Sequence, residues 1–186
     1  DIAVLNGINN LQIVCPADPK ELKVILPQII KSKKPTYLKM GKKNEKNIFE
    51  NKCYTKLGTP TKIKKGNDIC VFSTGNILVN ICEAVQKIKS NLSVEIVNIH
   101  TIKPLADRMI LPYLKKFKKI VIVEEHVSNG GLGSIIMKIA AKFNTNNTFK
   151  NINLGKKFIT GAGNLNHIRN KYKLDEMSLS KEISKF

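Results

Sequence analysis

Tryptophan is absent from this sequence, and aromatic residues make up only 6% of its 186 positions. Long hydrophobic runs are also missing, because no apolar stretch approaches the roughly 20 residues that a helix needs to span a bilayer. We therefore expect no membrane partner. The chain shows no secretory leader and begins at Asp1 rather than at a methionine, which we interpret as a truncation. Its hydrophobic fraction of 42% is typical of a globular protein with one core, or with one domain plus part of another.

Closely spaced metal ligands are missing as well. The sequence has four cysteines and three histidines, but no Cys-x-x-Cys pair and no matching pair of histidines. We therefore predict no metal site in this chain. The cysteines are expected to act as small buried side chains in a reducing cytosol, so the predicted location is cytoplasmic. They are Cys15, Cys53, Cys70 and Cys82.

Arginine is scarce although the chain is strongly basic. The net charge is +18, yet Arg108 and Arg169 are the two arginines among 32 basic residues, and the lysines are scattered along the whole chain. Specific phosphate recognition usually draws on arginine forks as well as lysine charges. We therefore predict no specific nucleic-acid partner, although non-specific polyanion binding at low salt is expected. A non-catalytic module that binds an anion through its basic surface stays open as an alternative.

The stretch Ile120–Ser134 organises the rest of the chain. It begins with four β-branched residues, which predict a short strand buried on both faces of a sheet. Glycines at 130, 131 and 133 then allow a sharp turn, and apolar residues from Ile135 to Phe143 return at helical spacing. This order of strand, glycine turn and helix is half of a parallel crossover in an α/β sheet.

Three polar residues, Glu124, Glu125 and His126, mark the point at which this strand leaves the core. One interpretation is structural: a polar strand end beside close packing of strand and helix. The other is chemical, with Glu125 and His126 as an acid/base pair, and we expect the adjacent carboxylates to raise the pKa of His126. A nucleotide site is rejected because the glycines lack the Gly-x-Gly-x-x-Gly spacing and because the carboxylates would repel a phosphate.

Shorter signals repeat the alternation of strands and helices. Asp18 is a good N-cap for a helix that starts at Pro19, between strands expected at 11–15 and 35–40. A polar, lysine-rich crossing follows and ends in a short strand near 61–64. Further strands are expected at 68–73, 94–99, 120–123 and near 157–160, with helices between them. The predicted fold is α/β, a mostly parallel sheet with helices on both faces, preceded by a partial α/β unit whose other strands lie upstream of Asp1.

Five motifs along the chain come in the order seen in transketolases, and the sequence resembles that family over nearly all of its length. The motifs are Pro16–Asp18, Pro35–Lys39, Thr101–Leu105, Val123–His126 and Gly130–Ser134. The Glu-Glu-His and Gly-Gly-Leu-Gly-Ser combination is especially similar to the C-terminal subunits of split transketolases. Deoxyxylulose-phosphate synthases and the beta subunits of 2-oxo-acid dehydrogenases share the layout and remain alternatives.

The resemblance implies part of a thiamine diphosphate and Mg²⁺ enzyme of carbohydrate metabolism that transfers a two-carbon ketol unit between sugar phosphates. Residues 1–45 would be the end of the pyrimidine-binding domain, 46–66 a linker, and 67–186 the transketolase C-terminal domain. The chain would be mainly structural and would support a homodimer or pair with an N-terminal subunit. We predict no catalytic and no cofactor-binding residue in it, and no activity when it is alone.

One residue is a candidate for substrate binding. Members of the family often place an arginine near the end of the last strand of the pyrimidine-binding domain, where it contacts the sugar phosphate. This chain has Lys39 at that position. A lysine keeps the positive charge but loses the bidentate fork of an arginine, so it orients a phosphate less strictly. The alternative is an ordinary solvated lysine at a strand end.

Overall fold

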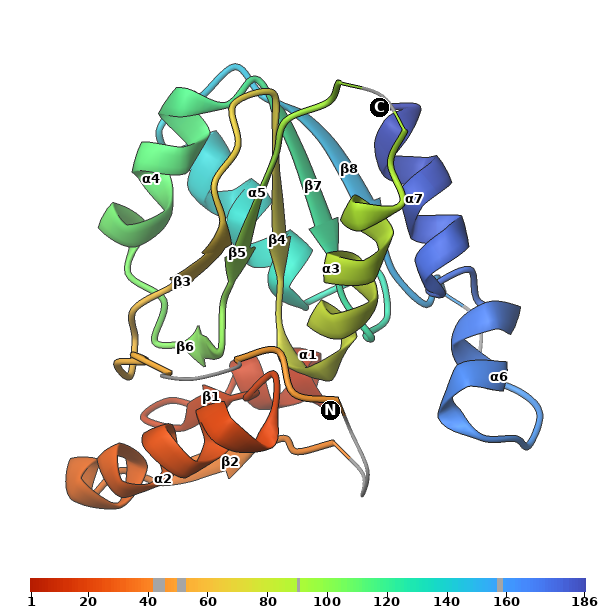
Figure 1. The fold of residues 1–186 in the computed structure, drawn as a ribbon. Helices are drawn as coiled ribbons and strands as arrows, with labels where there is room; N and C mark the ends of the chain where they lie inside the picture. The colour runs from red at the N-terminus through yellow and green to blue at the C-terminus, as the bar shows by residue number, and fades with distance from the viewer. Residues whose placement is uncertain (42–45, 50–52, 90, 157–158) are drawn as a thin grey trace.

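The computed structural model describes residues 1–41, 46–49, 53–89, 91–156 and 159–186 (Figure 1). The described residues form two sheets, with strand orders β3-β5-β4-β7-β8 and β2-β1-β6. In Figure 1 the smaller sheet and its helix lie below the larger sheet, so the chain is built as a small α/β unit under a larger one. None of the helices in the described residues is long and apolar enough to cross a membrane.

The larger sheet is mostly parallel. Its strands β4, β5, β7 and β8 run in one direction, and β3 pairs with β5 in the opposite direction. The central strand β4 is buried at every position, as a strand covered on both faces must be. The predicted α/β fold is thereby confirmed. The five strands are β3 (Thr61–Lys64), β4 (Ile69–Ser73), β5 (Val94–Asn98), β7 (Lys119–Val123) and β8 (Thr148–Ile152).

Helices cover both faces of this sheet because alternate residues of its strands point to opposite sides. Ile69 and Val71 of β4 pack in one core cluster with α3 and α7. Cys70 and Phe72 pack in another with α4 and α5. The helices are α3 (Leu78–Gln86), preceded by the 3₁₀ turn η1 (Gly75–Ile77), α4 (Asp107–Lys116), α5 (Leu132–Lys142), α6 (Leu165–Lys171) and α7 (Glu176–Ser184). In Figure 1, α6 lies at the edge of the molecule below α7.

The smaller sheet contains one parallel crossover. Strands β1 (Gln12–Val14) and β2 (Thr36–Leu38) are parallel and are joined by α2 (Pro19–Ser32). The Asp18 side chain accepts a hydrogen bond from the Glu21 N–H at 2.7 Å, which confirms the predicted N-cap. The third strand, β6 (Thr101–Lys103), pairs antiparallel with β1, and a short helix α1 (Ile2–Asn6) precedes them.

Two elements differ from the sequence prediction. The last strand of the larger sheet is β8 rather than a strand near 157–160; positions 157 and 158 lie outside the described residues, and 159–160 are not in a strand. β8 is a half-exposed edge strand, so its sequence lacks the apolar run of a central strand. The second difference is β6, because the sequence predicts no strand at 101–103, only the residues that follow the strand at 94–99. The division into 1–45, 46–66 and 67–186 stays a prediction.

Candidate functional site

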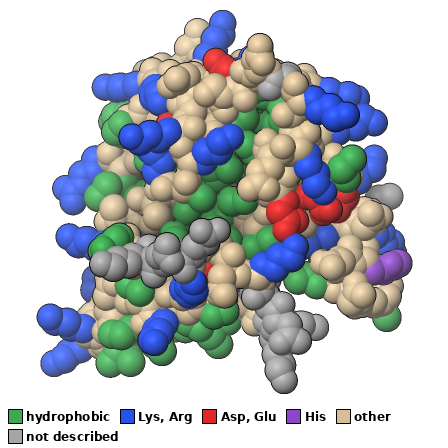
Figure 2. Space-filling model, in the orientation of Figure 1, with side chains coloured by type: hydrophobic (Ala, Val, Ile, Leu, Met, Phe, Trp, Pro, Cys, Tyr) green, Lys and Arg blue, Asp and Glu red, His purple; other side chains and the backbone are tan. Residues whose placement is uncertain are grey.

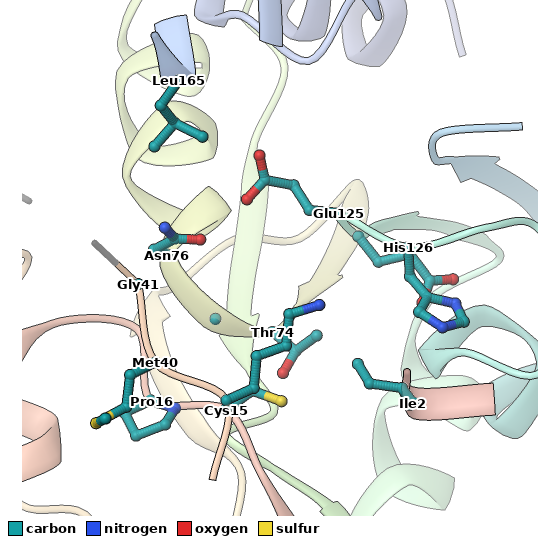
Figure 3. Close-up of a pocket in the computed structure, with 13 residues that line it drawn as sticks. Ile2, Cys15, Pro16, Met40, Gly41, Thr74, Asn76, Glu125, His126 and Leu165 are labelled. Carbon is teal, nitrogen blue, oxygen red and sulfur yellow. The ribbon is translucent and has the colours of Figure 1, made fainter. Parts of the chain in front are cut away.

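A pocket of about 190 Å³ lies where the two sheets meet (Figure 3). It is bounded by the residues that follow four strands: Cys15 after β1, Lys39 after β2, Thr74 after β4 and Glu124 after β7. The carboxyl ends of parallel strands are the usual ligand-binding edge of an α/β sheet. The structure thus brings all the site residues predicted from the sequence to one place, because Glu125 and His126 line the pocket too.

The carboxylate of Glu124 is used by the protein itself. The residue is 1% exposed, and its two carboxylate oxygens accept hydrogen bonds from the N–H groups of Leu132 at 2.7 Å and Gly133 at 3.0 Å. These are orphan donors of the first turn of α5, and a negative charge there also interacts favourably with the helix dipole. Glu124 therefore caps α5 across the glycine turn, which agrees with the structural interpretation of this residue.

The glycines of the turn are required for different structural reasons. Gly130 has φ +75°, a conformation that L side chains rarely adopt, and a Cβ there would lie 2.6 Å from the Cβ of Ala3. At Gly131 a Cβ would overlap the Glu124 Oε2. The turn thus lets α1 and the capping carboxylate approach the backbone closely, and the Leu132 and Gly133 N–H groups already donate to Glu124.

Glu125 is held by an arginine far away in the sequence. Its carboxylate accepts two hydrogen bonds from Arg169, from Nε at 2.7 Å and from Nη2 at 2.8 Å. The third guanidinium nitrogen, Nη1, donates to the Asn80 Oδ1 at 2.8 Å. Figure 3 shows Glu125 directed toward Leu165 and His126 toward Ile2. This geometry does not favour the predicted acid/base pair of Glu125 and His126.

His126 is a buried neutral imidazole. Its Nε2 accepts a hydrogen bond from the Ala3 N–H at 3.3 Å, so the proton is on Nδ1, which donates to the Val127 carbonyl at 3.0 Å. Burial lowers the pKa of His126, and this effect outweighs the opposite influence of the Glu124 carboxylate. The Glu124 carboxylate thus acts in the expected direction, but burial decides the net shift, and the pKa of His126 is lowered rather than raised.

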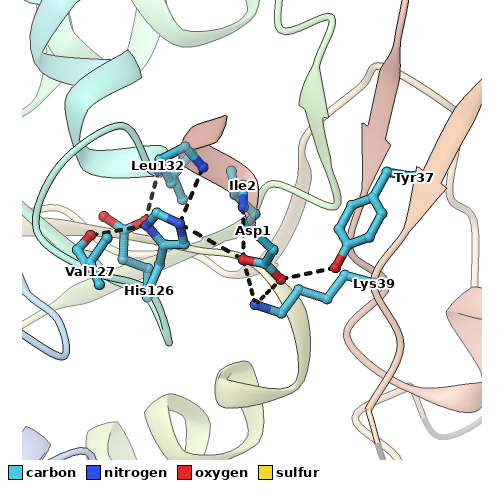
Figure 4. A network of polar contacts seen from close by, with 9 residues as sticks. Asp1, Ile2, Tyr37, Lys39, His126, Val127 and Leu132 are labelled. Carbon is cyan, nitrogen blue, oxygen red and sulfur yellow. Dashed lines mark hydrogen bonds and ion pairs between the residues drawn. The ribbon is translucent and has the colours of Figure 1, made fainter. Parts of the chain in front are cut away.

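Lys39 is engaged by a carboxylate in this structure. Its Nζ lies 3.0 Å from the Asp1 Oδ2, which also accepts a hydrogen bond from the Tyr37 hydroxyl at 2.9 Å (Figure 4). The other oxygen of Asp1 accepts from the Ile2 N–H at 2.7 Å and caps α1. Lys39 is about one-third exposed at the rim of the pocket, so the Asp1 carboxylate occupies the position that an anionic ligand would take at this ammonium group.

The sequence analysis did not single out several residues at or beside the pocket. Arg169, Asp1 and Leu165 join it only through the fold, and the scarcity of arginine is the one signal that could have drawn attention to Arg169. Cys15 also lines the pocket, but burial raises the pKa of its thiol to about 11, so the thiol stays protonated at neutral pH.

The remaining sequence features lie elsewhere. His100 is buried beside Thr101, with its Nδ1 2.8 Å from the threonine hydroxyl, and His167 is exposed on α6. Lysine and arginine side chains are spread over the whole visible face rather than gathered in one stripe (Figure 2). This distribution does not favour a dedicated polyanion surface on that face.

These strand ends, the capped glycine turn and the buried ion pair define an α/β module with a small pocket at the carboxyl ends of its parallel strands. Residues 58–176 match the family described as transketolase, C-terminal domain. The chain therefore belongs to the transketolase family.

Relatives of two kinds support this assignment. The chain is 27% identical over 180 residues to one subunit of the apulose-4-phosphate transketolase of Actinobacillus succinogenes, covering 96% of this chain and 58% of that protein. It is 27% identical over 188 residues to a 1-deoxy-D-xylulose-5-phosphate synthase of Dehalococcoides mccartyi, covering 98% of this chain and 30% of that protein. The chain thus spans little more than half of the first relative and less than a third of the second.

A solved structure shares the fold. The chain superposes on the protein described as "Split gene transketolase, inactive beta4 tetramer" with a TM-score of 0.87 and 20% identity, covering 99% of this chain and 60% of the other. Both sheets of the present structure therefore have their counterpart in that fold.

The described residues do not fit thiamine diphosphate with Mg²⁺. They contain no group of three or more His, Cys, Asp or Glu side chains that could hold a metal ion. Both glutamates of the pocket are already engaged, Glu124 by α5 and Glu125 by Arg169. The pocket, at about 190 Å³, is also smaller than the roughly 300–1,000 Å³ of typical ligand sites.

Proposed function

We propose that this chain is the C-terminal part of a transketolase-like transferase that moves a two-carbon ketol unit between sugar phosphates. The observation that carries the proposal is the match of residues 58–176 to the transketolase C-terminal domain. The first relative, whose name is that of an apulose-4-phosphate transketolase, supports a sugar phosphate as substrate. The complete enzyme requires thiamine diphosphate and Mg²⁺, which are bound by parts of the protein other than these residues.

The proposed division of labour follows from this. Residues 1–45 are the end of a pyrimidine-binding domain, 46–66 a linker and 67–186 the C-terminal domain. The chain is mainly structural in a cytoplasmic assembly, either a homodimer or a complex with an N-terminal subunit, and has no activity alone. The first relative is named as one subunit of its enzyme, which supports a partner chain here.

Lys39 is the proposed contribution of this chain to substrate binding. Its ammonium group lies at the rim of the pocket and already holds one anionic group, the carboxylate of Asp1. A substrate phosphate would replace that carboxylate or share the ammonium with it. Because a lysine contacts a phosphate as a point charge, the interaction would favour the phosphorylated substrate without fixing its rotation.

The test is steady-state kinetics of the complete enzyme that contains this chain. Replacing Lys39→Ala is expected to raise KM for a ketose phosphate on the order of 10-fold and to change kcat little, because the charge binds substrate and transition state alike. The matched control is Lys31→Ala, an exposed lysine in the last turn of α2. Equal KM values for Lys39→Ala and wild type would rule out the role of Lys39.

A separate assay tests the function itself. The purified chain is expected to show no saturable thiamine diphosphate binding by calorimetry, and the complex with its N-terminal part is expected to transfer a ketol unit. Because one relative is a 1-deoxy-D-xylulose-5-phosphate synthase, formation of 1-deoxy-D-xylulose 5-phosphate is the second activity to assay. Co-purification of a lipoyl-bearing acyltransferase would instead indicate a 2-oxo-acid dehydrogenase.

A further inference from the structure

One side chain of helix α6, that of Arg169, reaches into the sheet layer. Arg169 is the only residue of α6 that is buried, at 6% exposure, whereas six of the seven positions are partly or fully exposed. Its guanidinium group makes three hydrogen bonds that join α6 to the sheet layer and to α3. They are the two bonds to Glu125 and the bond to Asn80.

The position of α6 matters because its first residue borders the pocket. Leu165 lines the pocket near Glu125 and Asn76, and Figure 3 shows its side chain extending from α6 toward them. Leu165 and Asn76 also line a second, larger groove of about 780 Å³ that runs between α3, α6 and α7. The start of α6 therefore separates a small space beside Lys39 from a large one.

The ion pair that fixes α6 has the geometry of a strong contact. Two parallel N–H···O bonds join the guanidinium to the carboxylate, and such bidentate pairs combine charge with a defined orientation. The Arg169 side chain is 6% exposed and that of Glu125 23%, so solvent screens the pair little. Losing one partner leaves the other charge buried and unpaired, which releases the helix rather than letting it adjust.

We propose that α6 is a wall of the Lys39 pocket, that Arg169 is the positioning residue that holds this wall, and that Leu165 sets how long a sugar phosphate the pocket accepts. This inference rests on the proposed function for its substrate. With α6 in place, the pocket ends at Leu165. If the wall is removed, the space beside Lys39 becomes continuous with the groove on the far side of α6.

The first experiment measures the attachment of α6 by hydrogen exchange of the whole chain. Arg169→Ala is expected to speed amide exchange in 165–171 on the order of 10-fold or more, while amides of β4 and β7 keep their rates. Lys171→Ala is the matched control: it removes a cation of the same helix whose Nζ donates to the exposed Thr160 carbonyl and not to the sheet layer, so it is expected to change the rates much less than Arg169→Ala. Arg169→Lys is expected to behave like Arg169→Ala, because lysine cannot make the bidentate pair.

The second experiment measures specificity in the complete enzyme. For Leu165→Ala and for Arg169→Ala, the ratio of kcat/KM for a seven-carbon over a five-carbon ketose phosphate is expected to rise on the order of 10-fold, with the Lys171→Ala ratio unchanged. Leu165→Ala keeps the ion pair of Arg169 with Glu125, so it tests the length of the pocket without removing the attachment of α6.

The outcomes distinguish the parts of the proposal. Unchanged exchange in Arg169→Ala would overturn the role of Arg169 as the attachment of α6. Faster exchange with an unchanged specificity ratio in both variants would overturn the role of α6 as a wall of the substrate pocket. Absence of ketol transfer by the wild-type complete enzyme would count against the proposed function instead, and the exchange measurement would still decide the role of Arg169.

Discussion

Replacing Glu124→Ala should destabilise the fold strongly although the residue lies at the candidate site. The change removes the acceptor of two buried N–H groups at the start of α5, at 2.7 Å and 3.0 Å. Two hydrogen bonds to a charged acceptor, at roughly 1.5 kcal/mol each, give a loss of about 3 kcal/mol in the free energy of unfolding. For a chain of this size, that loss lowers the melting temperature by about 6–12 °C.

Urea denaturation followed by circular dichroism measures this loss directly. Glu124→Gln keeps one carbonyl oxygen as an acceptor, so about half of the loss is expected for that variant. The control is Glu182→Ala: Glu182 pairs with Lys150 at 2.7 Å, but its side chain is 39% exposed, so a change below about 1 kcal/mol is expected.

The refuting result is a small effect. If Glu124→Ala cost less than about 1 kcal/mol, the same as the exposed control, the two N–H groups would have to find other partners. Glu124 would then be free to act at the pocket, and the chemical interpretation of this strand end would regain support.

Three other changes test separate features. Gly131→Ala should lower the free energy of unfolding by about 2 kcal/mol, because the new Cβ would overlap the capping carboxylate of Glu124. Gly7→Ala should lower it by less than about 1 kcal/mol, because the nearest atom to the new Cβ is 3.5 Å away. Equal losses of stability for the two variants in thermal melts would contradict this. Burial lowers the pKa of His100 to about 4, so the unfolded state takes up a proton near pH 6.5 and the folded state does not. Stability should therefore fall by roughly 3 kcal/mol as the pH drops from 6.5 to 4, and this slope should be absent from His100→Gln; parallel curves from urea titrations would be inconsistent with the buried neutral ring. In native protein at pH 8, Ellman's reagent should modify the partly exposed Cys53 before Cys70, whose pKa burial raises far above its usual range, and early labelling of Cys70 would argue against its place in the core.

Local chemistry and burial on both faces made much of the fold predictable. Asp18 and Pro19 predict the start of α2 because an N-cap oxygen and a missing N–H both suit the first turn of a helix. The apolar runs of β4 and β7 predict central strands, since a strand with helices on both sides has no face left for polar residues.

Elements that depend on distant partners were not predictable. Thr148–Ile152 forms β8 by pairing with β7 at the edge of the sheet, and its mixed sequence carries no strand period. Thr101–Lys103 becomes β6 only because β1, almost ninety residues earlier, offers a free edge. Leu26 and Ile30 of α2 are apolar, yet they are exposed in this structure.

The location of the candidate site was more predictable than the roles of its residues. The polar strand end after β7 is readable in the sequence, and it lines the pocket with Lys39. The partners of its residues were not readable, because neighbours after a strand end can point to opposite sides: Glu125 turns away from His126 and meets Arg169, 44 residues later. Sequence adjacency suggested a coupled pair, whereas the fold gave each residue a different partner.

The pairing of β6 with β1 has a consequence for how this polypeptide can be cut. Besides the strand pairing, the Cys15 N–H donates to the His100 carbonyl at 2.7 Å, and the Lys103 Nζ donates to the carbonyls of Asn6 and Ile8. The stretch before residue 15 is thus joined to the stretch after residue 100 by hydrogen bonds that involve main-chain atoms. If a protease cleaved the chain at Thr59, the two fragments would stay associated and elute together in size-exclusion chromatography. Two genes that encode the segments before and after this point would likewise give polypeptides that associate.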